Sequence, residues 1–273
     1  MLGVFFILQL PKCIIYGIMV LTKSASKRRD YMINCYYHLL IEIILPRAIN
    51  YKDTAEYLTS RVNFAMLKDL YTKTLHEKRG MKGYVISGLT PIEKDRIYKQ
   101  NKPYLFQINT NNFVLALKLK ECLEQLDDIV SVKIKQESFK ENITELMTTT
   151  SMVIQLGEKN DQRYWTLDDS IILLYRRLTE NIKHKAQTFF ELPESELQQI
   201  DTFIESIEIR NKMDIINNYK GGKIFASSIF IKVKDDPMSQ IFANIALATG
   251  LGEKNSIGYG YCTERRKNDT RIT

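Results

Sequence analysis

A glycine-rich run near the C-terminus has the composition of a phosphate-binding loop. Residues 250–260 read Gly-Leu-Gly-Glu-Lys-Asn-Ser-Ile-Gly-Tyr-Gly, so two Gly-X-Gly pairs flank five mostly polar residues. Glycine is favoured where φ is positive or where the backbone must approach a ligand closely, and consecutive backbone N–H groups form concavities that bind anions. The candidate contacts to a phosphate-rich ligand are Gly250, Gly252, Lys254, Asn255, Ser256, Gly258 and Gly260.

The elements on either side of this run exclude two nucleotide-binding motifs. Apolar residues recur at helical spacing over Met238–Thr249, before the run, and alternate as in a strand over Ile257–Cys262. The predicted order is therefore helix, loop, strand, whereas a dinucleotide-binding fingerprint and a P-loop both need strand, loop, helix. The alternative to phosphate binding is a glycine-rich connection that serves turn geometry alone.

A second candidate for chemistry is His76, at the predicted end of a helix. Basic residues surround it in the sequence: Lys73, Lys78, Arg79 and Lys82. A histidine with an ordinary pKa of about 6.5 accepts or donates a proton near neutral pH, and neighbouring cations favour a phosphate ligand. The alternative role is a C-terminal helix cap. The other histidines fit less well, because His38 lies in an apolar strand and His184 at a Lys-rich helix end.

Both segments resemble motifs of one family, the CRISPR-associated endoribonucleases of the sixth Cas family in the RAMP superfamily, which cut precursor CRISPR RNA within its repeats. The family's C-terminal loop has the form G-h-G-x5-G-h-G, where h is hydrophobic, and residues 250–260 match it at every position. Residues 75–82 are similar to the family's active-site stretch, in which a His ends the first helix and a Lys follows six residues later. The resemblance extends over roughly residues 32–263.

The resemblance implies a metal-independent endoribonuclease that needs no cofactor. In such an enzyme the 2′-OH attacks the adjacent phosphorus and leaves a 2′,3′-cyclic phosphate. His76 would act as general acid or base, and Lys82 would stabilise charge on the phosphorane. The glycine loop would bind the RNA, and the basic residues of the predicted long helix, among them Lys185, could track its backbone. The implied partners are repeat RNA in precursor CRISPR RNA, subunits of a CRISPR effector complex and a second copy of this chain, all in the cytoplasm.

One departure from the family pattern keeps a second function open. Many members add a Tyr from the helix before the catalytic His, whereas the natural alignment places Asn63 or Phe64 there. We therefore assign no third catalytic residue. The alternative function is a RAMP-type subunit that binds repeat RNA in an effector complex without cutting it.

The sequence favours no metal site. Three acidic pairs could hold Mg²⁺ in principle, but each lies at a predicted element boundary, where Asp caps helices or forms turns. These pairs are Asp127-Asp128, Asp168-Asp169 and Asp235-Asp236. The four cysteines are dispersed, with no Cys-x-x-Cys motif and no neighbouring His to complete a zinc-type set, so we interpret them as buried thiols in a reducing cytosol.

The first thirty-one residues differ from the rest of the chain. Residues 1–30 carry five basic residues and one acidic residue, and hence +4 of the formal net charge of +7. Residues 2–21 are largely apolar but contain Pro11, and the basic residues follow the apolar run. We expect translation to start at or near Met32, with 1–31 a mis-called extension; the alternative is a genuine membrane anchor.

From Met32 onward the patterns predict an α+β protein of two tandem ferredoxin-like (RRM-type, βαββαβ) units. The expected domains are 32–138 and 150–265, followed by a basic tail at 266–273. The elements predicted for the first unit are strand 36–45, a helix from Asp53 to near His76, strands 84–86 and 104–108 joined by a loop at 90–102, a helix from Asn111 or Asn112, and strand 129–135. Those predicted for the second unit are strand 151–156, helix 167–185, strands 203–209 and 224–233, helix 238–249 and strand 257–262.

Overall fold

Two antiparallel four-stranded sheets form the framework of the structure. The computed structural model describes residues 34–157, 163–219 and 221–265. The expectations for residues 1–31 and for the tail at 266–273 therefore lie outside the described residues. Within the described ranges, none of the helices has the length and apolar character needed to span a membrane.

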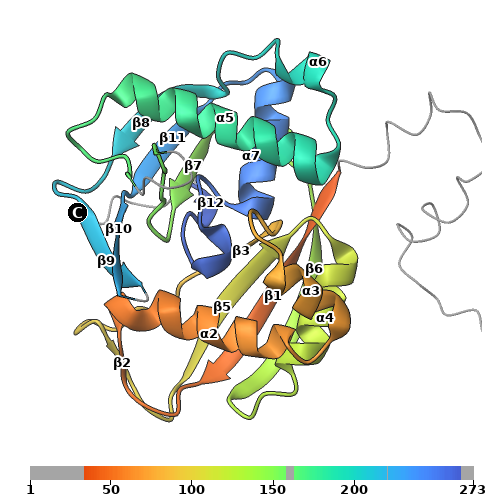
Figure 1. The fold of residues 1–273 in the computed structure, drawn as a ribbon, viewed down its shortest axis with the longest axis vertical. Helices are drawn as coiled ribbons and strands as arrows, with labels where there is room; N and C mark the ends of the chain where they lie inside the picture. The colour runs from red at the N-terminus through yellow and green to blue at the C-terminus, as the bar shows by residue number, and fades with distance from the viewer. Residues whose placement is uncertain (1–33, 158–162, 220, 266–273) are drawn as a thin grey trace, which may run out of the picture. The chain divides into compact units, whose positions relative to one another are not determined.

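The N-terminal sheet has the strand order β3-β5-β1-β6 (Figure 1). Its strands are β1 (Cys35–Ile44), β3 (Tyr84–Ile86), β5 (Pro103–Thr110) and β6 (Ile129–Ser138), and helices α2 (Thr54–Met66) and α4 (Phe113–Leu123) connect them. Leu39, Ile41 and Ile43 alternate along β1 and are fully buried, because successive side chains of a strand point to opposite faces. The first predicted ferredoxin-like unit is confirmed.

The C-terminal sheet repeats this arrangement with the order β12-β7-β11-β8. Its strands are β7 (Glu145–Thr148), β8 (Ile204–Ile209), β11 (Ile229–Val233) and β12 (Cys262–Glu264), and its helices are α5 (Ile171–Phe190), the short α6 (Glu194–Leu197) and α7 (Pro237–Thr249). In both sheets the first and third strands along the chain lie at the centre, and the second and fourth lie at the edges. The fold is therefore two tandem ferredoxin-like units, as predicted.

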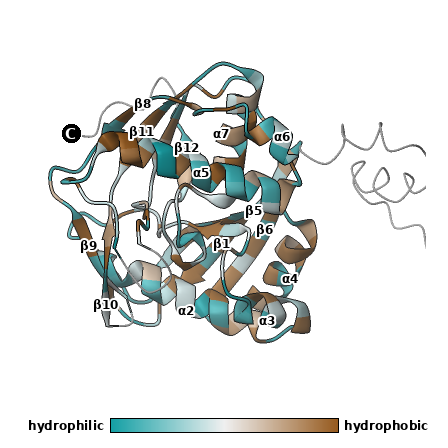
Figure 2. Cartoon of the chain, turned by 45° about the horizontal axis from the view of Figure 1, so that its top comes forward, coloured by the Kyte–Doolittle hydropathy of each residue, from teal (hydrophilic) through white to brown (hydrophobic). Residues whose placement is uncertain are grey.

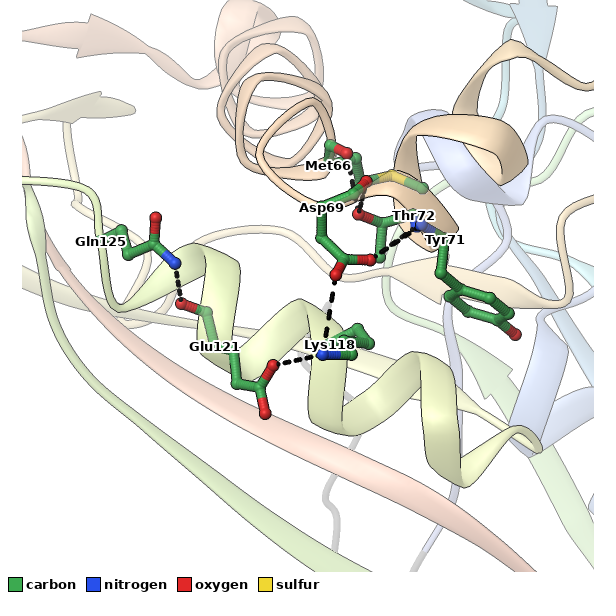
Figure 3. A network of polar contacts seen from close by, with 7 residues as sticks. All are labelled: Met66, Asp69, Tyr71, Thr72, Lys118, Glu121 and Gln125. Carbon is green, nitrogen blue, oxygen red and sulfur yellow. Dashed lines mark hydrogen bonds and ion pairs between the residues drawn. The ribbon is translucent and has the colours of Figure 1, made fainter.

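The single helix predicted from Asp53 to near His76 is wrong, because it is divided in two. Helix α2 ends at Met66 and α3 begins at Leu70 and ends at Glu77. Asp69 lies between them in an extended conformation and accepts hydrogen bonds from the backbone N–H groups of Tyr71 (2.9 Å) and Thr72 (3.2 Å), as Figure 3 shows. A side chain that satisfies the free N–H groups of a new helix favours a break at that point.

The strand predicted at 151–156 is also misplaced, since the first strand of the C-terminal sheet is β7, which ends at Thr148. Residues 152, 153 and 155 form only isolated bridges, in which Val153 pairs with Glu253 and Gln155 pairs with Tyr164. Met152, Val153 and Ile154 are nevertheless buried. Their apolar pattern reflects packing beside the glycine loop rather than membership of a sheet.

Three further boundaries differ from the predictions. The strand expected at 224–233 is divided into β10 (Gly222–Ala226), which pairs with β9 (Ile215–Tyr219) in a hairpin, and β11. The strand expected at 257–262 begins later, at Cys262, because residues 255–257 form a 3-10 turn, η3. The predicted loop at 90–102 contains a short strand, β4 (Ile97–Tyr98). This strand pairs with another short strand, β2 (Ile49–Asn50).

Helix α7 joins the two units. It contacts β1, β3 and β5 of the N-terminal sheet as well as β11 and β12 of its own sheet. The side-chain amide of Asn109 on β5 donates a hydrogen bond to the carbonyl oxygen of Leu247 on α7 (2.8 Å). Helix α5 carries both hydrophobic and hydrophilic residues along its length (Figure 2), which is the pattern of a helix with one buried face. Because α7 contacts the N-terminal sheet, the loop that follows α7 lies next to that sheet.

Candidate functional site

The glycine loop begins where α7 ends and turns back through several left-handed residues. Positive φ angles occur at its four flanking glycines and also at Lys254, where φ is 59°. Lys254 precedes the η3 turn formed by Asn255–Ile257. This turn contacts β3 of the N-terminal sheet, next to which the loop lies in Figure 1. The backbone thus makes a compact turn instead of an extended strand.

Two of the glycines are required by the packing of the loop itself. A Cβ atom on Gly260 would lie 1.9 Å from the carbonyl oxygen of Leu251, and one on Gly252 would lie 2.4 Å from that of Val153. No side chain fits at such distances from a backbone atom. The RNA contacts predicted for the glycines remain a prediction, and the structure adds that these two hold the loop closed against its neighbours.

Asn255 points into the interior of the loop. Its side chain is 8% exposed, and its amide nitrogen donates to the carbonyl oxygens of Leu251 and Tyr259, each at 3.0 Å. The amide oxygen accepts a hydrogen bond from the ammonium of Lys185 on α5 (2.9 Å). The amide nitrogen of Asn255 is therefore engaged by the loop and its amide oxygen by α5.

Lys254 and Ser256, on either side of Asn255, are half-buried and remain accessible. The Lys254 ammonium lies over the ring of Tyr164, 5.7 Å from its centroid. The backbone N–H groups of residues 254–256 donate no hydrogen bond to any other described residue. Successive free N–H groups beside a left-handed residue form an anion-binding concavity, so this part of the loop suits a phosphate group.

The structure brings the two predicted catalytic residues together. His76 lies in the last turn of α3, and the ammonium of Lys82 donates a hydrogen bond to its backbone carbonyl oxygen. Both side chains are half-buried. Burial lowers the pKa of Lys82 below its usual range. In this arrangement Lys82, rather than His76, caps the C-terminal end of the helix.

A single pocket connects this segment to the glycine loop. It has a volume of about 290 Å³, and residues 80–84 and 253–257 form two of its sides. Lys185 and Phe189 of α5 also line it. Of the predicted site residues, Lys82, Lys254, Asn255 and Ser256 line the pocket. The four glycines and His76 do not, and His76 lies beside it through its bond with Lys82.

The remaining candidates lie elsewhere. His38 on β1 hydrogen-bonds through Nδ1 to the side-chain oxygen of Asn109 (2.8 Å), and His184 is exposed on α5. Phe64 is 52% exposed on α2, with the cationic groups of Arg61 and Lys68 5.7 Å and 5.5 Å from its ring centroid. Neither Phe64 nor Asn63 lines the pocket.

One residue of each acidic pair takes a structural role. Asp128 forms an ion pair with Arg61 (2.5 Å), Asp169 accepts from the backbone N–H of Thr166 (2.9 Å), and Asp236 caps α7. In the part of the chain that the structure describes, no three His, Cys, Asp or Glu side chains gather in a cluster suited to a metal ion.

Sequence reasoning misjudged one residue of the site. The pattern suggested that Lys185, with other basic residues of the long helix, could track an RNA backbone, yet only 1% of its surface is exposed. The signal for burial was present, because Lys185 follows Leu174, Leu178 and Ile182 on the apolar face of α5. The sequence alone does not show what this buried ammonium contacts.

Comparison with known proteins gives one family. Residues 133–264 match the family model for the C-terminal part of the CRISPR-associated protein Cas6. A structure named CRISPR-associated protein Cas6 is 18% identical, with a TM-score of 0.63 over 85% of this chain and 100% of that chain. A RAMP protein described as binding different RNA substrates is 17% identical, with a TM-score of 0.54 over 85% of this chain and 100% of that one.

A third similar structure is a product complex of Cas6 from Thermus thermophilus. It is 14% identical, with a TM-score of 0.58 over 84% of this chain and 99% of that chain. No curated protein matches the chain in sequence. At these identities the structural likeness concerns the fold, which agrees with the two ferredoxin-like units described above.

Proposed function

We propose that this chain, whose residues 133–264 match the family model for the C-terminal part of Cas6, acts as a Cas6 protein: it binds the repeat RNA of a precursor CRISPR transcript and cuts it without a metal ion. One observation carries the proposal. Residues 80–84, which follow His76, and residues 253–257 of the glycine loop line the same pocket. A candidate acid or base beside a phosphate-binding loop suits cleavage of a phosphodiester.

The proposed reaction is an attack by the 2′-oxygen on the adjacent phosphorus. A bond forms between these atoms while the bond from phosphorus to the 5′-oxygen of the next nucleotide breaks. The 2′-OH gives its proton to a base, and the departing 5′-oxygen receives one from an acid. The products are a 2′,3′-cyclic phosphate and a 5′-hydroxyl. We assign His76 to one of the two proton transfers, because imidazole performs either near neutral pH.

Lys82 has a separate role in this proposal. Negative charge accumulates on the phosphorane oxygens as the 2′-oxygen attacks, and a nearby ammonium stabilises that charge. Lys82 lines the pocket and lies at the end of the helix that carries His76. Although burial lowers its pKa, a bound phosphate favours the charged form of a neighbouring amine.

The glycine loop would hold the RNA backbone. The free N–H groups of residues 254–256 and the ammonium of Lys254 offer donors to phosphate oxygens at one side of the pocket. Tyr164, beneath the Lys254 ammonium, is 6% exposed and supports it from the protein side. Binding through backbone donors and cations does not itself select a base sequence.

The test is incubation of purified protein with labelled repeat RNA in excess EDTA. We expect the unaltered protein to cut the RNA and His76→Ala to lose at least about 100-fold in single-turnover rate, the usual scale for loss of a general acid or base. An RNA with a 2′-deoxy sugar at the cut site should bind without cleavage. His184→Ala is the matched control, since it removes an exposed histidine outside the pocket.

Other outcomes would point to specific alternatives. Tight binding of repeat RNA by the unaltered protein without cleavage would favour the non-cutting RAMP subunit, which the Asn63 and Phe64 positions also suggest. Cleavage that survives His76→Ala would place the acid or base on another residue. Cleavage that stops in EDTA and returns with Mg²⁺ would contradict the metal-independent mechanism.

A further inference from the structure

Lys185 is buried on α5 directly behind the glycine loop. It is 1% exposed, and its ammonium donates hydrogen bonds to the carbonyl oxygen of Gly250 (2.6 Å), the carbonyl oxygen of Gly252 (2.8 Å) and the side-chain oxygen of Asn255 (2.9 Å). A lysine is rarely buried to this degree without a reason, since removing an ammonium from water is costly. The contacts identify the reason as the loop.

The number of acceptors matches the charged form of the side chain. An ammonium has three N–H donors, and three oxygens surround Lys185 at hydrogen-bonding distance. A neutral amine has two donors and would leave one of these oxygens unpaired. Burial lowers the pKa of Lys185 to about 7, while the nearby Cys262 and Glu253 act in the opposite direction. The three acceptors also favour the ammonium.

These bonds determine which groups of the loop turn inward. Lys185 draws in the carbonyl oxygens of Gly250 and Gly252, and through Asn255 it is linked to the carbonyl oxygens of Leu251 and Tyr259. The acceptors from both ends of the loop are thus gathered around one interior network. The backbone N–H groups of residues 254–256 are left out of that network, and these three residues line the pocket.

The positive charge of Lys185 is not cancelled by a carboxylate in direct contact. Its partners are two backbone carbonyls and an amide oxygen. Glu253, the nearest acidic residue of the loop, accepts instead from the backbone N–H of Gln155 (3.1 Å) and lies 3.9 Å from Arg177. A partly desolvated cation behind the loop adds to its attraction for an anion.

We propose that Lys185 is a positioning residue for RNA: its ammonium holds the glycine loop in the shape in which the N–H groups of residues 254–256 face a phosphate of the bound strand. The proposal rests on the proposed function for the identity of the ligand. It does not place Lys185 in contact with the RNA. It separates the residues that shape the binding loop from those that perform chemistry, which come from α3 and the segment after it.

The first test compares Lys185→Met with Lys120→Met. Lys120 on α4 also donates to a backbone carbonyl, that of Val132 (2.9 Å), but lies outside the pocket. We expect Lys185→Met to raise the Kd for 2′-deoxy repeat RNA about 10-fold or more, the scale for loss of hydrogen bonds to a charged group. The cleavage rate at saturating RNA should change by less than about 3-fold, since His76 and Lys82 are untouched. Lys120→Met should match the unaltered protein in both.

The second test needs no RNA. Hydrogen exchange of the amides in residues 250–260 should be about 10-fold faster in Lys185→Met than in the unaltered protein, with α4 unchanged. If Lys185→Met does not fold, the unaltered protein provides the measurement. NMR of [15N]lysine-labelled protein should then show an ammonium signal assigned to Lys185 whose protons exchange slowly with water.

These results separate the two proposals. Faster loop exchange with no RNA binding by the unaltered protein would overturn the proposed function and leave the role of Lys185 in shaping the loop intact. An unaltered Kd in Lys185→Met, a loss of cleavage rate without a change in Kd, or a Lys185 ammonium that exchanges as fast as exposed lysines would each overturn the positioning role.

Discussion

The packing of the glycine loop determines which residue type can occupy position 260. A Cβ atom at this position would lie 1.9 Å from the carbonyl oxygen of Leu251 and 2.9 Å from the side-chain nitrogen of Asn255. The φ angle of 71° is also one that side chains disfavour. The motif that marks the family in the sequence is therefore, at this residue, a requirement of packing as much as of ligand binding.

This gives a prediction for Gly260→Ala. The substitution should lower the free energy of unfolding by about 2–4 kcal/mol, because the backbone must shift to admit the methyl group. Gly88→Ala is the control, since its Cβ would meet only the Thr150 methyl group at 3.7 Å, and it should change stability by less than about 1 kcal/mol. Urea unfolding of both variants measures the difference. Equal stability would mean that the loop relaxes without cost.

At the scale of elements, the break between α2 and α3 determines where His76 lies. Asp69 caps α3, and its other carboxylate oxygen lies 3.6 Å from the Lys118 ammonium on α4 (Figure 3). The hydroxyl of Thr72 donates to the carbonyl oxygen of Met66 (2.8 Å), which ties the new helix to the end of the old one. These contacts anchor the first turn of α3, while His76 occupies its last turn.

We expect Asp69→Ala to lower the free energy of unfolding by about 1 kcal/mol, the usual cost of losing an N-cap. Asp69→Asn keeps the cap and removes the charge, so it should cost less than about 0.5 kcal/mol, because the ion pair with Lys118 is partly exposed. Urea unfolding distinguishes them. If Asn destabilised the protein as much as Ala, the ion pair rather than the cap would anchor α3.

At the scale of the molecule, the described residues from Cys35 onward belong to one compact unit. Hydrogen bonds join elements of the N-terminal unit to elements of the C-terminal unit. The hydroxyl of Tyr261, just before β12, donates to the side-chain oxygen of Gln107 on β5 (2.6 Å), and the side chain of Asn244 on α7 bonds to the backbone of Lys140 after β6. A pocket that draws on both sheets needs such contacts to keep its sides in register.

Buried tyrosines in both units predict how stability depends on pH. Burial raises the pKa of Tyr84, Tyr98 and Tyr261 far above the ordinary 10.0 and that of Tyr259 to about 12. The folded state therefore keeps protons that the unfolded state loses above pH 10, so this contribution to stability is complete below pH 10 and declines as pH rises toward 12 and beyond.

The contribution of these tyrosines to the urea midpoint should therefore be constant near pH 8–9. Above about pH 10 the midpoint should fall steadily. Tyr98→Phe removes one such group and should make the fall less steep, although it also loses the hydrogen bond to the carbonyl oxygen of Leu89 (2.9 Å) at every pH. A midpoint that does not change between pH 9 and 11.5 would contradict the burial of these hydroxyls.

Local patterns in the sequence were sufficient for much of the fold. The residues of β3, the N-cap of α4 at Asn112 and helix α7 follow from spacing and capping chemistry, and the strand order of both sheets follows from the βαββαβ succession. The contact between the Lys82 ammonium and the carbonyl oxygen of His76 was not foreseeable from spacing, because six residues of extended chain can span about 20 Å.

Tertiary contacts decided the rest. Residues 152–154 have the apolar character of a sheet strand, yet they pack beside the glycine loop, because what buries them is a segment about a hundred residues further along the chain. Lys185 looked like a surface cation, and only the folded loop supplies the three oxygens that hold it. The sequence by itself determined the repeated unit and the glycine motif, because these depend on neighbours along the chain, and its resemblance to the family supplied His76 and Lys82 as catalytic candidates. Two features depend on the tertiary structure, because they form only where helix α7 brings distant residues together. They are the pocket between residues 80–84 and the glycine loop, and the buried Lys185 ammonium behind that loop.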